Sequence, residues 1–370
     1  MKNTMKMTTL LFAVAFLAAA SFAATVEEGA WINLFDGETL YGWTVLGDAN
    51  WRVEEGVIVA DEGDSGYIAT TACFMDYELE ATLRVTRNGK GAVSFRAPLA
   101  GHPKETGGDV IMLDAGEDNV SFSEVRIRVV GDEAEAWVNE HPVAVSPANA
   151  KGHIAIHYQN YHSDRGRPRI EIQEVRLRPL VMRSLFNGEN LDGWNIIPDR
   201  ESEFLVEDGM LKVLDGPGQI ETEEVFRDFI LQLDIISNGD HLNSGVFFRG
   251  PPGVWWRGYE AQIRNQWMRD DRTRPVDYGT GGIYGVNPAR KVTSSDYEWF
   301  TMTVVVNDNH MAVWLDDYQV ADYLDTRPVH PGADGKNGYV PDAGTIHLQG
   351  HDPATDLDFK NIHIQEYPVQ

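Results

Sequence analysis

The sequence predicts an all-β protein that folds as two β-sandwiches, or jelly rolls, in tandem. Apolar and polar residues alternate over stretches such as residues 78–85 and 300–306, as they do in strands with one buried face. Turns rich in glycine, asparagine and aspartate separate these stretches, and no long amphipathic helix follows the N-terminal segment. Many short strands joined by tight turns are typical of sandwiches and jelly rolls.

The chain is strongly acidic, with 57 Asp+Glu against 31 Lys+Arg and a net charge of −26 over 370 residues. Such a surface repels phosphate backbones, so we expect no nucleic-acid partner. Cys73 is the single cysteine, which excludes an internal disulfide framework and a cysteine-based zinc finger. We expect Cys73 to be a buried small apolar residue and assign Trp43, Trp194 and Trp314 to the cores.

Residues 1–23 have the pattern of a secretory signal peptide. Lys2 and Lys6 precede an apolar run over residues 10–20, and small residues lie at the −3 and −1 positions of a cleavage site after Ala23. The run is shorter than the ~20 residues that span a bilayer, and no cysteine follows it to carry a lipid. We therefore expect a periplasmic or extracellular protein without a membrane anchor; the alternative is a buried N-terminal helix.

One sequence pattern occurs twice, about 150 residues apart. FDGETLYGW at residues 35–43 returns as FNGENLDGW at 186–194, and VSFRAP at 93–98 returns as VFFRGP at 246–251. So many ordered matches indicate two copies of one domain.

The repeat divides the exported chain into two domains, residues 24–180 and 181–370. The second copy is the longer one, because about 24 extra residues separate Arg249 from Trp314. We expect this extra segment to distinguish the two domains in function.

Seven blocks of the second copy occur in a characteristic order: LFNG at 185–188, VEDG at 206–209, NSGVFFR at 243–249, GYEAQI at 258–263, TGGIYG at 280–285, IHLQGH at 346–351 and FKNI at 359–362. With them, the region from 183 to 367 resembles the 3-keto-disaccharide hydrolase family, also called the 3-keto-glucoside 1,2-lyase/hydratase domain. The first copy keeps the framework motifs but has KGA at residues 90–92 in place of Asn-Ser-Gly, and it lacks the GYE and TGGIY blocks. We expect it to be a degenerate, non-catalytic partner.

The resemblance implies a concanavalin A-like jelly roll that cleaves 3-keto-glycosides. A ketone at C3 acidifies the C2 hydrogen; once that proton is removed, the glycosidic oxygen on C1 can leave, and water then adds back. Net hydrolysis by this route needs a base, a group that stabilises the enediolate and a proton donor. The two flanking carboxylates of ordinary glycosidases are not required.

Glu260 is the candidate base. Alternation places Glu260 and Gln262 on one face of their strand, where a carboxylate and an amide could contact a sugar. The alternative is a solvent-facing pair on an edge strand. Asn243, from the Asn-Ser-Gly block, is a further candidate for substrate binding.

Arg249 is the candidate stabiliser of the enediolate. It follows an apolar run, and a half-buried guanidinium must be paired, either with a carboxylate such as Glu260 or with a developing oxyanion. Because Arg96 lies at the equivalent place in the first copy, a structural ion pair explains Arg249 equally well.

His351 is the candidate proton donor, since imidazole titrates near neutrality. By alternation His347, Gln349 and His351 share a face, which makes Gln349 a candidate sugar ligand. Residues 154–159 of the first copy keep part of this pattern, so a hydrogen-bonded surface histidine is the alternative.

The extra segment, residues 264–291, is basic on an acidic chain. Its cations suit an oxyanion or an acidic substrate, and its aromatic rings suit the apolar faces of sugars. Arg264, Trp267 and Tyr284 are therefore candidate substrate-binding residues; the alternative is a solvated loop whose arginines pair with the acidic surface. The charged residues are Arg264, Arg269, Arg272, Arg274, Arg290 and Lys291, against Asp270, Asp271 and Asp277.

No cofactor is assigned, although a divalent metal stays open. Asp352, Asp356 and Asp358 form an oxygen-rich loop that could hold calcium, with a plain acidic turn as the alternative. A catalytic divalent ion between Glu260 and His351 is also compatible with the sequence.

The sequence thus predicts that the second domain cleaves an oxidised glycoside, its carbohydrate partner. The chief rival is a secreted, lectin-like carbohydrate-binding module with no turnover. A third interpretation is a surface scaffold in which both copies have decayed, against which the intact GYE and TGG blocks of the second copy argue.

Overall fold

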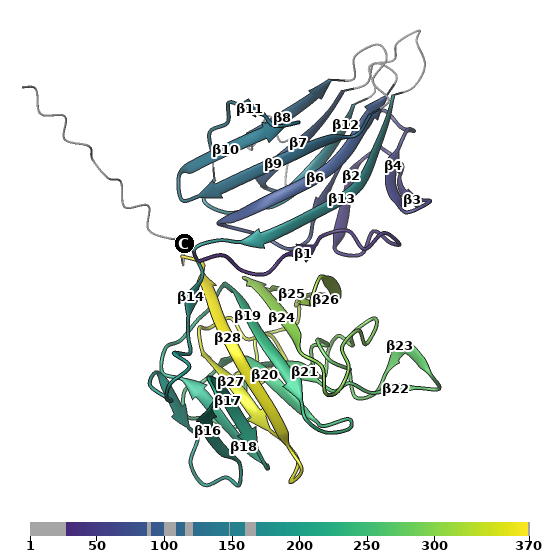
Figure 1. Ribbon diagram of the computed structural model, residues 1–370. Helices are drawn as coiled ribbons and strands as arrows, with labels where there is room; N and C mark the ends of the chain where they lie inside the picture. Colours follow the sequence, from purple (N-terminus) through teal and green to yellow (C-terminus); the bar gives the residue numbers. More distant parts are fainter. Residues whose placement is uncertain are drawn as a thin grey trace, which may run out of the picture.

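The protein is all-β and consists of two concanavalin A-like jelly rolls, as the sequence predicts (Figure 1). In the part of the chain that the computed structural model describes, every regular element is a strand, and no helix is long and apolar enough to cross a membrane. The predicted signal peptide, residues 1–23, lies outside the described residues. These are 27–86, 90–99, 109–114, 121–147, 149–159 and 168–368.

The first jelly roll packs a larger antiparallel sheet on a smaller one. Along the larger sheet the described strands run β11 (His141–Val143), β10 (Glu133–Val138), β9 (Ser123–Val130), β6 (Tyr77–Thr86), β13 (Arg169–Pro179), β4 (Val57–Ala60) and β3 (Trp51–Glu54), with β1 (Ile32–Asn33) pairing to β13. The smaller sheet is β2 (Trp43–Gly47), β5 (Ser65–Thr70), β12 (His153–Gln159), β7 (Lys90–Ala97) and β8 (Asp109–Asp114).

The second jelly roll has the same arrangement. Its larger sheet runs β16 (Glu203–Glu207), β17 (Met210–Leu214), β28 (Asp356–Glu366), β19 (Phe229–Ser237), β24 (Phe300–Asn307), β25 (His310–Leu315) and β26 (Tyr318–Leu324), with β14 (Arg183–Ser184) on β28. The smaller sheet is β15 (Trp194–Ile196), β18 (Gly218–Thr222), β27 (Thr345–Gly350), β20 (Ser244–Gly250) and β21 (Tyr259–Ile263). A hairpin of β22 (Trp267–Met268) and β23 (Asp271–Pro275) projects from it.

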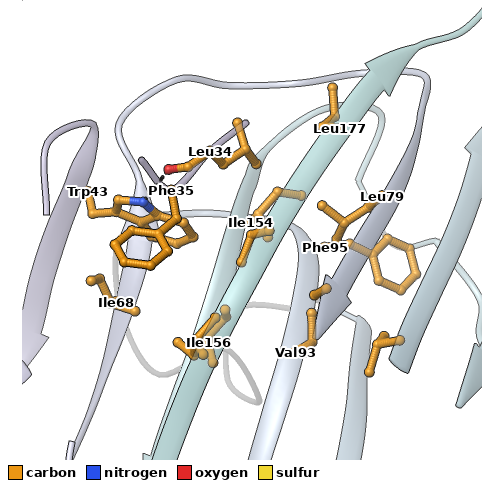
Figure 2. Close-up of a cluster of buried hydrophobic side chains, with 14 of the residues drawn as sticks. Leu34, Phe35, Trp43, Ile68, Leu79, Val93, Phe95, Ile154, Ile156 and Leu177 are labelled. Carbon is orange, nitrogen blue, oxygen red and sulfur yellow. Dashed lines mark hydrogen bonds between the residues drawn. The ribbon is translucent and has the colours of Figure 1, made fainter. Parts of the chain in front are cut away.

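Each core lies between the two sheets of its jelly roll, because alternate side chains of every strand point inward. Figure 2 shows this in the first jelly roll, where Trp43 belongs to the buried cluster with Phe35 and Ile68 and its indole N–H donates to the Leu34 carbonyl oxygen over 2.5 Å. The Trp194 indole makes the equivalent bond to Leu185 over 2.8 Å. The prediction that both tryptophans are core residues is confirmed, and Cys73 is buried as expected.

The two jelly rolls share an interface. Trp314 is fully buried there, in the hydrophobic cluster of the first jelly roll, and its indole N–H donates to the Asn33 carbonyl oxygen over 2.9 Å. From the other end of the second domain, Tyr367 donates its hydroxyl to the Cys73 carbonyl oxygen over 2.9 Å. An ion pair of Arg290 with Asp36 at 2.6 Å adds a polar contact.

An arginine with a left-handed backbone occupies the same place in both domains. Arg249 (φ 56°) lies at a bulge of β20, 1% exposed, and its guanidinium contacts Asp228 at 2.9 Å. Arg96 (φ 49°) on β7 contacts Asp76 at 2.8 Å. Each arginine also donates to three backbone carbonyl oxygens, so the ion pair and the hydrogen bonds together offset the strained backbone.

We expect Arg249→Met to lower the free energy of unfolding by about 3–5 kcal/mol, because it removes the nearest cation of the buried Asp228 carboxylate. Equilibrium unfolding in urea measures this effect. Arg183→Met, which breaks the exposed pair with Glu224, is the control and should cost no more than about 1 kcal/mol. Equal effects of the two substitutions would contradict the structural role of Arg249.

Candidate functional site

The outer face of the smaller sheet in the second domain carries a row of three polar side chains and one phenylalanine. Strand register places Glu221, His347, Phe247 and Glu260 side by side across β18, β27, β20 and β21. The residues between these positions along each strand, such as Leu348, belong to the core. Alternation therefore determines which face can carry chemistry, and Glu260 lies on it as predicted from its strand pattern.

The neighbouring row contains Gln219, Gln349, Gly245 and Gln262. Gly245 leaves a space that the Glu260 side chain fills, since a Cβ atom built on Gly245 would lie 2.4 Å from the Glu260 carboxylate oxygen. The glycine of the Asn-Ser-Gly block is thus needed for the position of the carboxylate over the sheet.

Two sequence blocks that are separated along the chain lie together at the edge of this sheet. The backbone N–H of Tyr284 donates to the carbonyl oxygen of Glu260 over 2.9 Å, and Gln262 exchanges backbone hydrogen bonds with Gly281 and Gly282. The TGGIYG block therefore continues the sheet beyond β21 and carries Tyr284 to the side of Glu260.

Glu260 forms the floor of a cavity of about 220 Å³. The cavity exceeds the ~150 Å³ that admits a benzene ring, so one six-membered sugar ring is an appropriate occupant by size. Its walls come from β20, the loop before β21, the TGGIYG block and the loop after β26. The lining residues are Phe247, Trp256, Arg257, Gly258, Glu260, Tyr284, Asp334, Lys336 and Asn337.

Burial raises the pKa of Glu260 to about 8. The carboxylate of Asp277 raises the pKa further, whereas the Lys336 ammonium and a hydrogen bond from the Trp256 side chain lower it. The Lys336 stem crosses Gly285, and its amine lies 4.8 Å from the centre of the Tyr284 ring. A carboxyl group that titrates close to neutrality beside a cation is equipped to accept and return a proton.

A second buried acid supports the sheet but does not line the cavity. Glu221 accepts hydrogen bonds from the Thr345 hydroxyl and from the backbone N–H of Gly253, both over 2.8 Å. His347, bonded to Thr345 over 2.6 Å, is fully buried, and burial lowers its pKa to about 4. The imidazole is therefore neutral at neutral pH, and it lies 3.4 Å from Gln219 and 3.5 Å from Glu221 of β18.

Several predicted substrate-binding residues gather around Asp277 instead of in the cavity. Gln262 donates to the Asp277 carbonyl oxygen over 3.0 Å, Asn243 donates to its carboxylate over 3.4 Å, and Arg264 lies 3.7 Å from that carboxylate. Gln349 is buried in the same row as Gln262. These side chains support the floor beside Glu260.

Arginines of the basic segment 264–291, which was expected to meet an oxyanion or an acidic substrate, have partners within the fold. Arg272 donates to the carbonyl oxygens of residues 292–294 and lies over the Trp267 ring at 4.2 Å, while Arg290 reaches Asp36 of the first jelly roll. Trp267 does not line the cavity; of the three candidates in the segment, Tyr284 does.

The structure also corrects two catalytic assignments. Arg249 has Asp228 as its partner instead of Glu260, and nearly all its donors are used within the fold. His351 pairs with Asp352 at 2.7 Å beyond the end of β27. Four residues along that strand put it about 13 Å from the row of Glu260, whereas C1 and C2 of a sugar are bonded neighbours. Glu260 at C2 and His351 at the oxygen on C1 therefore cannot act on the same sugar.

Lys336 and Trp256 are the cavity residues that sequence reasoning missed as partners of Glu260. Both lie on irregular loops without periodicity, and the loop of Lys336 reaches β21 only because Gly258 exchanges backbone hydrogen bonds with Ala333 and Gly335. No local sequence pattern predicts a contact between this loop and β21. Paired tryptophans at 255–256 were the one available signal.

In the first jelly roll the equivalent row has lost its acid. Register places Ala155, Ser94 and Val110 where the second domain has His347, Phe247 and Glu260. Met112 likewise stands at the position of Gln262. In the smaller sheet of the first domain, the described side chains at these positions thus include no carboxylate.

Within the described residues, no three His, Cys, Asp or Glu side chains are placed so that they could hold a metal ion together. This applies to the loop with Asp352, Asp356 and Asp358.

Comparison with known proteins gives a family for the chain. Among solved structures, a candidate glycosyl hydrolase from Parabacteroides distasonis is 23% identical, with a TM-score of 0.42 over 50% of this chain and 99% of that one. The carbohydrate-binding module CBM66 from Bacillus subtilis is 15% identical, with a TM-score of 0.34 over 49% of this chain and 99% of that module.

A curated 3-keto-disaccharide hydrolase from Bacteroides thetaiotaomicron is 27% identical over 150 residues, which are 35% of this chain and 51% of that enzyme. The chain thus spans about half the length of this relative. The family model described as a 3-keto-alpha-glucoside-1,2-lyase-like domain matches residues 30–164 and 181–365, most of the chain. The protein therefore belongs to the 3-keto-alpha-glucoside-1,2-lyase-like domain family.

Proposed function

We propose that the second domain cleaves 3-keto-glycosides by elimination across C1 and C2 followed by addition of water. The observation that carries this proposal is Glu260, a carboxyl group with a pKa raised to about 8 on the floor of a cavity the size of one sugar ring. The family of the chain and the name of its curated relative support the same chemistry.

In the first step the Glu260 carboxylate removes the proton from C2. The electron pair of the broken C–H bond forms a C2–C3 double bond, and the ketone oxygen on C3 becomes negative. Two cations line the cavity: Lys336, whose charge acts on Glu260, and Arg257, which donates to the Trp256 carbonyl oxygen. We assign the stabilisation of this oxygen to Lys336, in place of Arg249.

In the second step the C3 carbonyl re-forms, a C1–C2 double bond appears and the bond between C1 and the glycosidic oxygen breaks. The departing oxygen needs a proton. Glu260 has just accepted one, and its raised pKa makes it a suitable acid, so a single carboxyl group can serve both steps. This replaces the assignment of His351 as proton donor.

In the last step water adds to C1 and a proton returns to C2, so that the sum of the steps is hydrolysis. Glu260, ionised again after it has protonated the leaving group, takes a proton from the attacking water and passes it to C2. No oxocarbenium ion forms, so this route needs Glu260 as its acid and base and no second carboxylate on the other side of the bond.

Glu260→Gln should lower turnover of a 3-keto-glucoside by at least 10²-fold, because the amide cannot accept the C2 proton. Product release is followed by chromatography, with and without a chelator to test for a metal. Glu223→Gln, an exposed substitution in the same domain, should retain full activity.

The same substitution has a predicted effect on stability that shows whether the variant is folded. Glu260 has a pKa raised from 4.5 to about 8 in the folded state, so its contribution to stability is complete below pH 4.5 and is lost as the pH rises towards 8. Glu260→Gln should therefore unfold at a higher temperature than the parent at pH 8. Full turnover by this variant would overturn the assignment of the base; glycan binding by the parent protein without product would indicate the lectin-like alternative.

The pH dependence tests the role of Lys336. Since the base is the ionised form, kcat/KM should rise with pH to a plateau above about 8. Lys336→Gln removes the charge that lowers the pKa of Glu260, so the midpoint should move to higher pH and the plateau should fall by about 10²-fold. Lys291→Gln, which removes a cation that packs on Tyr318 outside the cavity, is the control. An unchanged midpoint in the Lys336 variant would contradict the proposed contact.

We also propose that the protein acts in the periplasm or outside the cell, on the basis of residues 1–23. The mass of the protein recovered from its native host should correspond to a chain that begins at Ala24; an intact Met1 would contradict this.

A further inference from the structure

The loop between β20 and β21, residues 251–258, is fixed to the sheet by two buried side chains of β18. The backbone N–H of Gly253 donates to the Glu221 carboxylate over 2.8 Å, and that of Trp256 donates to the amide oxygen of Gln219 over 2.9 Å. Anchors of this kind hold a loop in one conformation while its side chains stay free to meet a ligand.

Trp256 in this loop has two properties that are unfavourable for stability. Its backbone is left-handed (φ 54°), which is strained for a bulky residue, and the residue is 43% exposed. Its neighbour Trp255 meets it edge-on at 6.5 Å between ring centres and is covered on another side by Arg200 at 4.6 Å. The fold thus keeps an exposed indole in a fixed position at the wall of the Glu260 cavity.

The proposed reaction relates this indole to the leaving group. C2 has two carbon neighbours in the ring: C3, whose oxygen becomes negative, and C1, which carries the departing oxygen. The cavity places a cation, Lys336, and an indole, Trp256, close to the Glu260 carboxylate. Lys336 is suited to lie next to the negative oxygen on C3. In that orientation the oxygen on C1 and the group attached to it lie next to the Trp256 indole.

We propose that the Trp256 indole is the platform for the leaving group and selects leaving groups that present a flat apolar face. An aryl ring and the apolar face of a second pyranose share this chemistry. This inference rests on the proposed function, because it takes the orientation of the sugar from the elimination at Glu260.

Steady-state kinetics with three substrates tests the proposal: 3-keto-glucosides whose leaving groups are 4-nitrophenol, glucose and methanol. Relative to the methyl substrate, Trp256→Leu should lower kcat/KM for the aryl or the glucosyl substrate by about 10-fold. The substrate whose ratio falls identifies the source of the apolar face.

Two further variants separate the ring from its N–H group. Trp256→Phe keeps an aromatic face but removes the hydrogen bond to Glu260. It should therefore preserve the ratios of kcat/KM between the substrates. The midpoint of the pH dependence of kcat/KM should move to higher pH for all three substrates. Trp299→Leu alters a comparably exposed tryptophan, 39% against 43%, that does not line the cavity, and should change neither quantity. Unchanged ratios in Trp256→Leu, or equal changes in Trp299→Leu, would overturn the proposal.

A binding measurement distinguishes failure of this inference from failure of the proposed function. The parent protein and Trp256→Leu are titrated calorimetrically with 4-nitrophenyl and methyl glucosides that carry no ketone and cannot undergo the elimination. A preference of the parent protein for the aryl ligand that Trp256→Leu abolishes supports the platform even if no 3-keto-glycoside is cleaved. Cleavage by the parent protein with no Trp256-dependent preference in either assay would overturn the platform and leave the function standing.

Discussion

The pairing of β20 with β21 determines where chemistry can occur in this protein. Phe247 lies opposite Glu260 in that register, and a shift by one residue would turn Glu260 into the core and Ala261 outward. The carboxylate can lie over the sheet only because Gly245 offers no side chain beneath it. Burial at this position then raises the pKa of Glu260. The strand register and Gly245 together therefore determine both the place and the raised pKa of the carboxyl group.

The features that could be predicted from the sequence are those that alternation controls. The strand character and the face on which Glu260 and Gln262 lie follow from period-two patterns. The adjacency of GYEAQI and TGGIYG blocks could not be read from such a pattern, because it depends on hydrogen bonds between segments about 20 residues apart around an irregular hairpin.

Arg249 and Lys336 show why the charged groups were harder to place. Arg249 was considered as a partner of Glu260, but it lies at a bulge with a left-handed backbone, where local alternation fails, and its guanidinium contacts Asp228. Lys336 comes from a loop about 75 residues after Glu260, held by backbone bonds to Gly258. The cations that composition did highlight, such as Arg290, stabilise the contact between domains.

The interface between the jelly rolls affects how the second domain can be handled in isolation. Trp314 and Tyr367 belong to the second domain, yet both are fully buried and complete the hydrophobic cluster of the first. A fragment that begins at β14 would expose the rings of Trp314 and Tyr367 to water on the surface opposite its cavity. The exposed apolar patch would favour self-association of the fragment. The first jelly roll thus covers apolar side chains of its neighbour that water would otherwise reach.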